Sequence, residues 1–269
     1  MHLLIDADSL IYKAACPCET LEYVLSIDGE RVMLFQYKSE LEAFAADMPP
    51  EWGDFEWWQE LTALEPVENA LFALNLKLNS IIEESGCDSY SLHLTKGENF
   101  RHRIATIRPY KGTRTSKPAH HKACFEYLES DWGATYTYGL EADDVVSMSL
   151  SGDPEMVVAH IDKDIDTVAG KHYNFDTYEF YFVTQQEALV NFYRQMLVGD
   201  TSDNIAGVDG IGKVGAAKMI HTNLNDLEMF SVICSAFDND VDRVLETGRL
   251  LHMTRELHED GTPVLWEFP

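Results

Sequence analysis

Two aspartates three residues apart precede a short glycine-rich turn in the last third of the chain. Asp200 and Asp203 lie in G-D-T-S-D-N at 199–204, and G-V-D-G-I-G-K follows at 207–213. Paired carboxylates suit a divalent cation. A glycine turn before a helix leaves backbone N–H groups free for a phosphate, or carbonyls free for a monovalent cation. A metal site beside a phosphate-binding turn is typical of a nuclease.

Further acids stand where predicted strands end or a predicted helix begins. They are Asp6 and Asp8 after the apolar run at 3–5, Glu141, Asp143 and Asp144 at a helix start, and Asp162 and Asp164 after a strand predicted at 155–161. Functional groups gather at the carboxyl ends of strands in open α/β sheets, so these acids are expected to converge. Helix capping alone would explain Glu141 and one aspartate. Asp166 extends the last group, but its simpler interpretation is a solvated acid.

A crowded set of carboxylates requires cations, because like charges repel. The ligands are oxygen-only, with no His or Cys in register, and this favours Mg²⁺ or Mn²⁺. Two such ions would support phosphodiester hydrolysis by activating water and stabilising the leaving oxygen. The sequence therefore predicts a cluster that holds two or more ions.

The net charge of −26 over 269 residues argues at first against a nucleic-acid partner. The basic residues, however, are concentrated: residues 96–122 hold eight Lys or Arg and one acid. Such an island on an acidic body is consistent with a local polyanion-binding surface, and the alternative is a solvated basic surface. The sequence shows no signal-peptide or membrane-spanning pattern, and its five cysteines lack a metal-finger spacing, so we expect a cytoplasmic protein with reduced thiols.

Strand and helix patterns alternate along most of the chain. Strands are predicted at 3–6, 89–94, 134–138, 155–161, 173–175 and 178–183, a hairpin at 21–27 and 31–37, and helices at 67–84, 119–128, 141–150 and 185–198. This order predicts an α/β fold with a mostly parallel sheet covered by helices and a helical C-terminal portion. An acidic insert at 39–65 contains Trp52, Trp57 and Trp58 but no Lys or Arg, and is expected to be a loop with a helical end that packs its tryptophans down.

Six motifs in order resemble the 5′-nuclease superfamily, which includes phage and bacterial 5′→3′ exonucleases, flap endonucleases and the nuclease domain of bacterial DNA polymerase I. They are L-I-D-A-D-S-L-I-Y (4–12), N-F-R (99–101), Y-K-G-T-R (110–114), G-L-E-A-D-D (139–144), I-D-K-D (161–164) and the block at 199–213. The resemblance implies a PIN-like core at 1–183 with a helical arch at about 96–122. It also implies a helical region at 184–269 with a helix-three-turn-helix element at about 199–221, often with bound K⁺.

The resemblance also implies residue roles. One metal cluster would comprise Asp6, Glu141, Asp143 and Asp144, and the other Asp162, Asp164, Asp200 and Asp203. Lys111 and Arg114, with Arg101, would contact the scissile phosphate. Tyr110 would stack on a terminal base. The DNA-binding residues would be Tyr110, Gly207, Gly210, Gly212, Lys213 and Lys218.

Two positions depart from the family pattern. Leu94 stands where many relatives carry a further metal-binding aspartate, for which Asp8 could substitute, and Asp209 replaces a common proline. The leading hypothesis is a monomeric, Mg²⁺-dependent 5′→3′ exonuclease that removes DNA flaps or RNA primers, as stand-alone phage replication enzymes do, in the host cytoplasm. The alternatives are a structure-selective DNA-binding protein without cleavage, and a PIN-type ribonuclease, against which the glycine turn argues.

Overall fold

The computed structural model describes residues 1–49, 52, 54–114 and 116–269. The chain forms two compact units. The larger unit comprises Met1–Leu10, Lys77–Ser116 and Tyr127–Pro269, and the smaller comprises Ile11–Leu76 and Lys117–Glu126. None of the described helices has both the length and the apolar character needed to cross a membrane.

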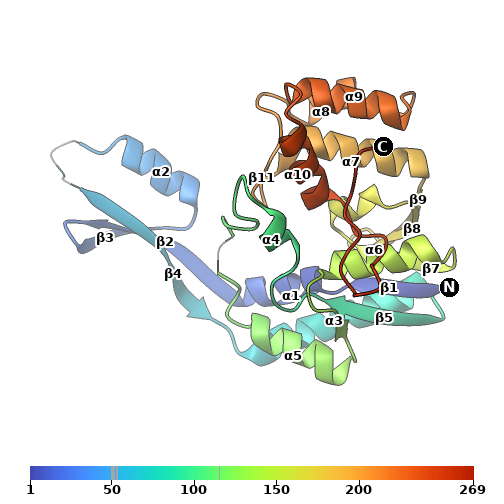
Figure 1. Ribbon diagram of the computed structural model, residues 1–269. Coiled ribbons are helices and arrows are strands. Elements are labelled where there is room, and N and C mark those ends of the chain that lie inside the picture. The colour runs from blue at the N-terminus through green and yellow to red at the C-terminus, as the bar shows by residue number, and fades with distance from the viewer. Residues whose placement is uncertain (50–51, 53, 115) are drawn as a thin grey trace. The chain divides into compact units, whose positions relative to one another are not determined.

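A six-stranded sheet organises the larger unit (Figure 1). Its strand order is β6 (Thr135–Tyr136), β5 (Ser89–Leu94), β1 (His2–Asp6), β7 (Met156–His160), β8 (Gly170–Asn174) and β9 (Glu179–Val183). All neighbouring strands are parallel except β8 and β9, which pair antiparallel. The central strands β1 and β7 are apolar runs because both of their faces are covered. The predicted mostly parallel sheet is therefore confirmed.

Helices cover this sheet. Helix α6 (Ala142–Gly152) packs against β1, β5, β7 and β8, while the part of α3 (Val67–Ser85) from Lys77 onward lies on the other face (Figure 1). The predicted helix at 67–84 matches α3, whose Leu74, Leu78 and Ile81 are fully buried. Helix α5 (His121–Asp131) precedes β6, and the short η3 (Lys163–Thr167) follows β7.

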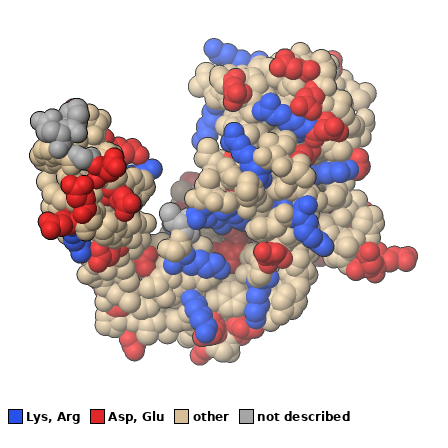
Figure 2. Space-filling view, turned by 60° about the vertical axis from the view of Figure 1, so that its left-hand side comes forward, with Lys and Arg blue, Asp and Glu red and all other residues tan. Residues whose placement is uncertain are grey.

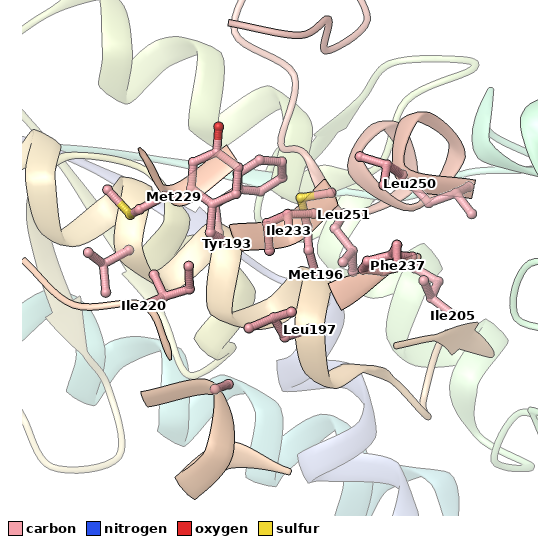
Figure 3. Packing of buried hydrophobic residues seen from close by; sticks show 14 of the residues in the cluster. Tyr193, Met196, Leu197, Ile205, Ile220, Met229, Ile233, Phe237, Leu250 and Leu251 are labelled. Carbon is pink, nitrogen blue, oxygen red and sulfur yellow. The ribbon is translucent and has the colours of Figure 1, made fainter. Parts of the chain in front are cut away.

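The C-terminal helices of the larger unit share an apolar core (Figure 3). They are α7 (Gln185–Val198), α8 (Lys213–Met219), α9 (Asp226–Ala236) and α10 (Val241–Leu251), with a two-stranded ladder of β10 (Gly199–Asp200) and β11 (Ile205–Ala206) after α7. Tyr193, Met196 and Leu197 of α7 meet Ile233 of α9 and Leu251 of α10 in this core. These helices belong to the same compact unit as the sheet, so the domain boundary expected at residue 183 falls inside that unit.

The smaller unit contains a three-stranded antiparallel sheet in the order β3 (Glu30–Phe35), β2 (Glu19–Ile27) and β4 (Phe55–Leu64). The predicted hairpin is confirmed, and Asp28 and Gly29 supply its positive φ values of 52° and 82°. This unit also contains η1 (Cys16–Cys18), α2 (Lys38–Ala46) and the part of α1 (Asp8–Ala15) from Ile11 onward.

The insert at 39–65 differs from its prediction. It forms most of α2 and the whole of β4, which pairs along β2. Trp52, Trp57 and Trp58 are each 42% exposed, so they do not pack down into a core. β4 instead places Trp57 and Trp58 on a three-stranded sheet, and this strand is exposed along most of its length. Acidic side chains gather on this part of the smaller unit (Figure 2). Residues 50, 51 and 53 of the insert lie outside the described residues.

The basic segment at 96–122 is mostly irregular, contrary to the helical arch expected there. Among its described residues only α4 (Arg101–Ile104) and the first turn of α5 are helical. Pro109 and Pro118 each lack an N–H, and Lys111 adopts a positive φ of 55°. These features interrupt the helical ladder that an arch helix would need.

Candidate metal-binding site

The parallel strands bring the predicted acids to one edge of the larger unit. Asp6 ends β1, Asp162 follows β7, and Glu141 caps the N-terminus of α6. Asp200 lies in β10. We call the following set the acidic cluster: Asp6, Asp8, Glu141, Asp143, Asp162, Asp164, Asp200 and Asp203.

Burial and mutual repulsion shift the pKa values of the acidic cluster. Burial raises the pKa of Asp6 well above its ordinary value, and the charges of Asp8 and Asp162 raise it further. Burial likewise raises the pKa of Asp143, with the charges of Asp6 and Asp162 adding to the effect. Burial and the charge of Asp162 raise the pKa of Asp164 to about 7. Full ionisation of the cluster is therefore unfavourable without added positive charge.

Two basic residues from the predicted Y-K-G-T-R motif do pair with the acidic cluster. The Lys111 ammonium forms an ion pair with Glu141, and its Nζ lies 3.9 Å from Asp203 Oδ2. The Arg114 guanidinium donates from Nη2 to Asp203 Oδ1 at 2.6 Å. Because Lys111 and Arg114 have side chains 19% and 46% exposed, both remain accessible to an anionic ligand.

Lys163 also belongs to the site, although the sequence reasoning missed it. Its Nζ donates to Asp200 Oδ2 at 3.1 Å and lies 3.6 Å from Asp164 Oδ1. Burial would raise the pKa of Asp200, but the hydrogen bond and charge of Lys163 lower it overall. The signal available in the sequence was its position between Asp162 and Asp164 in I-D-K-D.

A small cavity of about 90 Å³ opens among these residues. Six carboxylates line it, and they are those of Glu141, Asp143, Asp162, Asp164, Asp200 and Asp203. Figure 2 shows acidic side chains recessed on the larger unit, with basic side chains at the surface beside them. Asp164 Oδ1 is buried and has no hydrogen-bond partner among the residues that the structure describes. An unsatisfied carboxylate oxygen among oxygen-only donors fits a hard divalent cation.

The structure does not support the predicted contact between Arg101 and the scissile phosphate. Its side chain is 1% exposed, and its five N–H donors all meet protein acceptors. The acceptors are Leu250 O, His252 O, Glu141 Oε2 and both carboxylate oxygens of Asp144, at 2.7–3.2 Å. Arg101 therefore joins α4 to α6 and to the end of α10, and no N–H remains for a substrate.

The structure also argues against Asp144 as a metal ligand. It is fully buried, and each of its oxygens accepts from Arg101 at 2.7–2.8 Å. The backbone N–H groups of Glu141 and Thr254 also donate to it, at 3.1 and 3.0 Å. Burial would raise the pKa of Asp144, but Arg101 and these donors lower it to about 2. Its lone pairs are thus already used within the protein.

Tyr110 does not offer a stacking surface for a base. It is 5% exposed, and its hydroxyl lies 2.8 Å from Glu141 Oε2 and 2.6 Å from Asp203 Oδ2. Leu94 is buried, as expected for an apolar strand residue. Asp8 accepts from the backbone N–H of Thr95 at 3.0 Å, beside the position of Leu94, so Asp8 remains the candidate substitute ligand.

The glycine turn is closely packed at Gly207 and exposed to solvent at Gly210 and Gly212. A Cβ on Gly207 would lie 2.3 Å from the carbonyl carbon of Val198, and one on Gly199 would lie 2.3 Å from the amide nitrogen of Gly207. Side chains are therefore excluded at this end of the antiparallel β10–β11 ladder, where the two backbones approach closely. Gly210, Gly212, Lys213 and Lys218 are exposed. The five predicted DNA-binding residues of the turn and of α8 thus divide into a structural position, Gly207, and four surface positions, while the sixth, Tyr110, is buried.

Comparison with known proteins shows the fold. No protein-family model matches the sequence. The structure is similar to that of the bacteriophage T5 D15 protein crystallised with metal ions, at 17% identity and a TM-score of 0.56, covering 93% of this chain and 88% of that one. It is also similar to T5 5′-exonuclease with bound zinc, at 16% identity and a TM-score of 0.56, covering 93% and 89%. The T5 D15 flap endonuclease in complex with DNA and metal ions matches at 16% identity and a TM-score of 0.55, covering 93% and 88%. This chain therefore has the fold of a phage 5′ nuclease.

Proposed function

We propose that the chain is a divalent-metal-dependent 5′ nuclease that hydrolyses phosphodiester bonds near the 5′ ends of DNA. The observation that carries the proposal is the convergence of six carboxylates with Lys111 and Arg114 around one cavity. The fold supports it, because proteins of this fold include a 5′-exonuclease and a flap endonuclease. In its finer form, the proposal is that the enzyme removes flaps or RNA primers during replication and also accepts RNA–DNA hybrids. It further proposes a monomeric, phage-type enzyme that acts in the host cytoplasm.

The acidic cluster divides into two groups of metal ligands. Asp6, Glu141 and Asp143 would hold one ion, with Asp8 beside them, and Asp162, Asp164, Asp200 and Asp203 would hold another. Mg²⁺ or Mn²⁺ in these places would supply an activated water and neutralise the leaving oxygen. Lys163 orients Asp200 through its 3.1 Å hydrogen bond.

Lys111 and Arg114 would act on the phosphate itself. Both present cationic groups beside the cavity and can exchange a carboxylate partner for a phosphate oxygen. Negative charge on the phosphate oxygens is stabilised most where the donors are already in place. Arg101 and Asp144 would support this site from behind, by fixing Glu141 at the start of α6.

The surface around residues 199–221 would hold the duplex. Gly210 and Gly212 leave backbone groups exposed, and Lys213 and Lys218 add positive charge. Backbone donors and lysines of this kind contact phosphates without reading sequence. K⁺ bound to the turn carbonyls is part of the same proposal.

The test is cleavage of an end-labelled 5′-flap duplex in Mg²⁺. The native chain is compared with Asp162→Ala/Asp164→Ala and with a control, Glu83→Ala/Glu84→Ala, that removes two adjacent exposed acids from α3. We expect short 5′ products from the native chain and the control, and a loss of at least about 100-fold in the Asp162/Asp164 variant. Equal products from all three proteins would refute the metal site. Tight flap binding by the native chain without any product would favour a binding protein, and cleavage of single-stranded RNA alone would favour a ribonuclease.

A further inference from the structure

Two buried histidines and an aspartate converge behind the acidic cluster. His160 ends β7, Asp166 lies in η3, and His172 lies in β8. His160 Nε2 is 2.8 Å from His172 Nδ1, and Asp166 Oδ1 is 3.9 Å from each of these nitrogens. The point equidistant from the three atoms lies about 2.1 Å from each, which is the length of a Zn–N or Zn–O bond.

In each histidine, the ring nitrogen that points away from the other histidine indicates the tautomer, and therefore which nitrogen carries a lone pair for a metal ion. His160 Nδ1 lies 2.7 Å from the carbonyl oxygen of Asp162, and His172 Nε2 lies 2.9 Å from that of Val168. A carbonyl oxygen only accepts, so these two nitrogens carry the protons. In neutral rings, the facing Nε2 and Nδ1 atoms then both carry lone pairs, and the Tyr181 hydroxyl oxygen lies 3.1 Å from the same His160 Nε2. Metal-binding histidines show this arrangement, with the second nitrogen donating to a carbonyl or carboxylate.

We propose that His160, Asp166 and His172 bind one Zn²⁺ ion. Two imidazoles with one carboxylate favour Zn²⁺ over Mg²⁺, which prefers oxygen ligands. Both histidines are at most 2% exposed, and the Tyr181 hydroxyl donates to Asp166 Oδ1 at 2.7 Å and so fixes that carboxylate. Asp166 is therefore a ligand rather than the solvated acid that its sequence context suggested. This proposal concerns different residues from the acidic cluster and does not depend on the proposed nuclease activity.

The ion would have a structural role. Asp162 and Asp164 both lie between His160 and Asp166 along the chain. An ion that joins β7, η3 and β8 would close a short loop around these two acids and limit their movement. Asn191 of α7 already donates to the Asp166 carbonyl at 3.0 Å, so the same turn is tied to a helix on its other side.

Zn²⁺ titration against a chromophoric chelator tests the proposal, with the full-length protein in excess Mg²⁺ so that the acidic cluster is occupied. We expect one tightly held Zn²⁺ per native chain, and at least about tenfold weaker binding in His172→Gln and Asp166→Asn. His258→Gln, at an exposed histidine, is the matched control and should bind as the native chain does. Asp162→Ala/Asp164→Ala should also retain the ion, which separates this site from the acidic cluster.

Thermal unfolding provides a second readout that needs no variant. Zn²⁺ at 100 times its dissociation constant should raise the Tm of the native chain by ~5 °C in excess Mg²⁺. Native protein that holds no Zn²⁺ in the titration and shows no Tm shift would overturn the proposal. So would a Zn²⁺ ion that is lost from Asp162→Ala/Asp164→Ala but kept by a folded Asp166→Asn variant. Because the native chain is measured directly, a negative result for it would count against the proposal even if His172→Gln misfolds.

Discussion

Replacement of Arg101 by methionine separates the structural role of this residue from the role expected of it in catalysis. Methionine keeps much of the side-chain volume but removes all five donors. It leaves the Asp144 carboxylate buried without its cation, and it frees the carbonyls of Leu250 and His252. Loss of one partner of a buried ion pair costs about 3–5 kcal/mol. We therefore expect Arg101→Met to lose at least about 3 kcal/mol in its free energy of unfolding.

The loss of unfolding free energy in Arg101→Met should also depend on pH, in a direction that the pKa of Asp144 sets. The pKa of Asp144 falls from 3.8 to about 2 in the folded chain, which corresponds to roughly 2 kcal/mol of stability. Because the folded pKa is the lower one, this contribution is present above pH 3.8 and disappears as the pH falls through 2. In Arg101→Met, burial without the cation would raise the pKa of Asp144 instead. The deficit of the variant should therefore widen as the pH rises from 4 to 7.

Urea unfolding at pH 4, 5.5 and 7 measures this deficit, with flap cleavage measured in parallel. Arg103→Met is the matched control, because Arg103 lies on the same short helix and is exposed. We expect the control to stay within about 0.5 kcal/mol of the native chain. If Arg101→Met kept native stability at every pH and lost only cleavage, the structural assignment would be wrong, and a direct contact between Arg101 and the phosphate would be the better explanation.

Three further predictions concern the site and its supports. Lys111→Ala should lower turnover by about 100-fold while duplex affinity changes little, because its charge acts on the transition state; an equal loss in binding alone, measured by titration of a labelled flap, would contradict that role. Metal-free protein should lose stability as the pH rises from 4 to 8, by up to roughly 4 kcal/mol from Asp164 alone, since its folded pKa of about 7 is above the ordinary 3.8. Mg²⁺ should restore that stability in thermal unfolding at pH 8, and a flat metal-free profile would count against the crowding of the cluster. Gly207→Ala should destabilise the fold by more than about 2 kcal/mol, whereas Gly212→Ala, which meets open space, should be nearly neutral. Similar unfolding midpoints for the two variants would refute the close backbone approach at Gly207.

Much of the fold could be predicted from the sequence because its signals are local. Apolar runs ending near acids marked β1 and β7, and the 3.6-residue period at 67–84 marked α3. The insert at 39–65 was less predictable. Its β4 is exposed along most of its length, so it lacks the apolar alternation that identifies a strand buried on one face. Pairing with β2, which is distant in sequence, makes it a strand.

The sequence by itself determined which chemistry is available. The spacing of acids after predicted strands indicated a cluster at one sheet edge, and the structure brings those acids together there. The tertiary structure alone decided how each group is used. Arg101 and Asp144 are 43 residues apart and Asp144 and Thr254 are 110 apart, yet their contacts remove both predicted site residues from the accessible surface. The role of Lys163 beside Asp200 and the pairing of His160 with His172 were likewise revealed only by contacts in the folded chain. A residue's type and spacing are written in the sequence, whereas its burial and its partners depend on distant segments that meet only when the chain has folded.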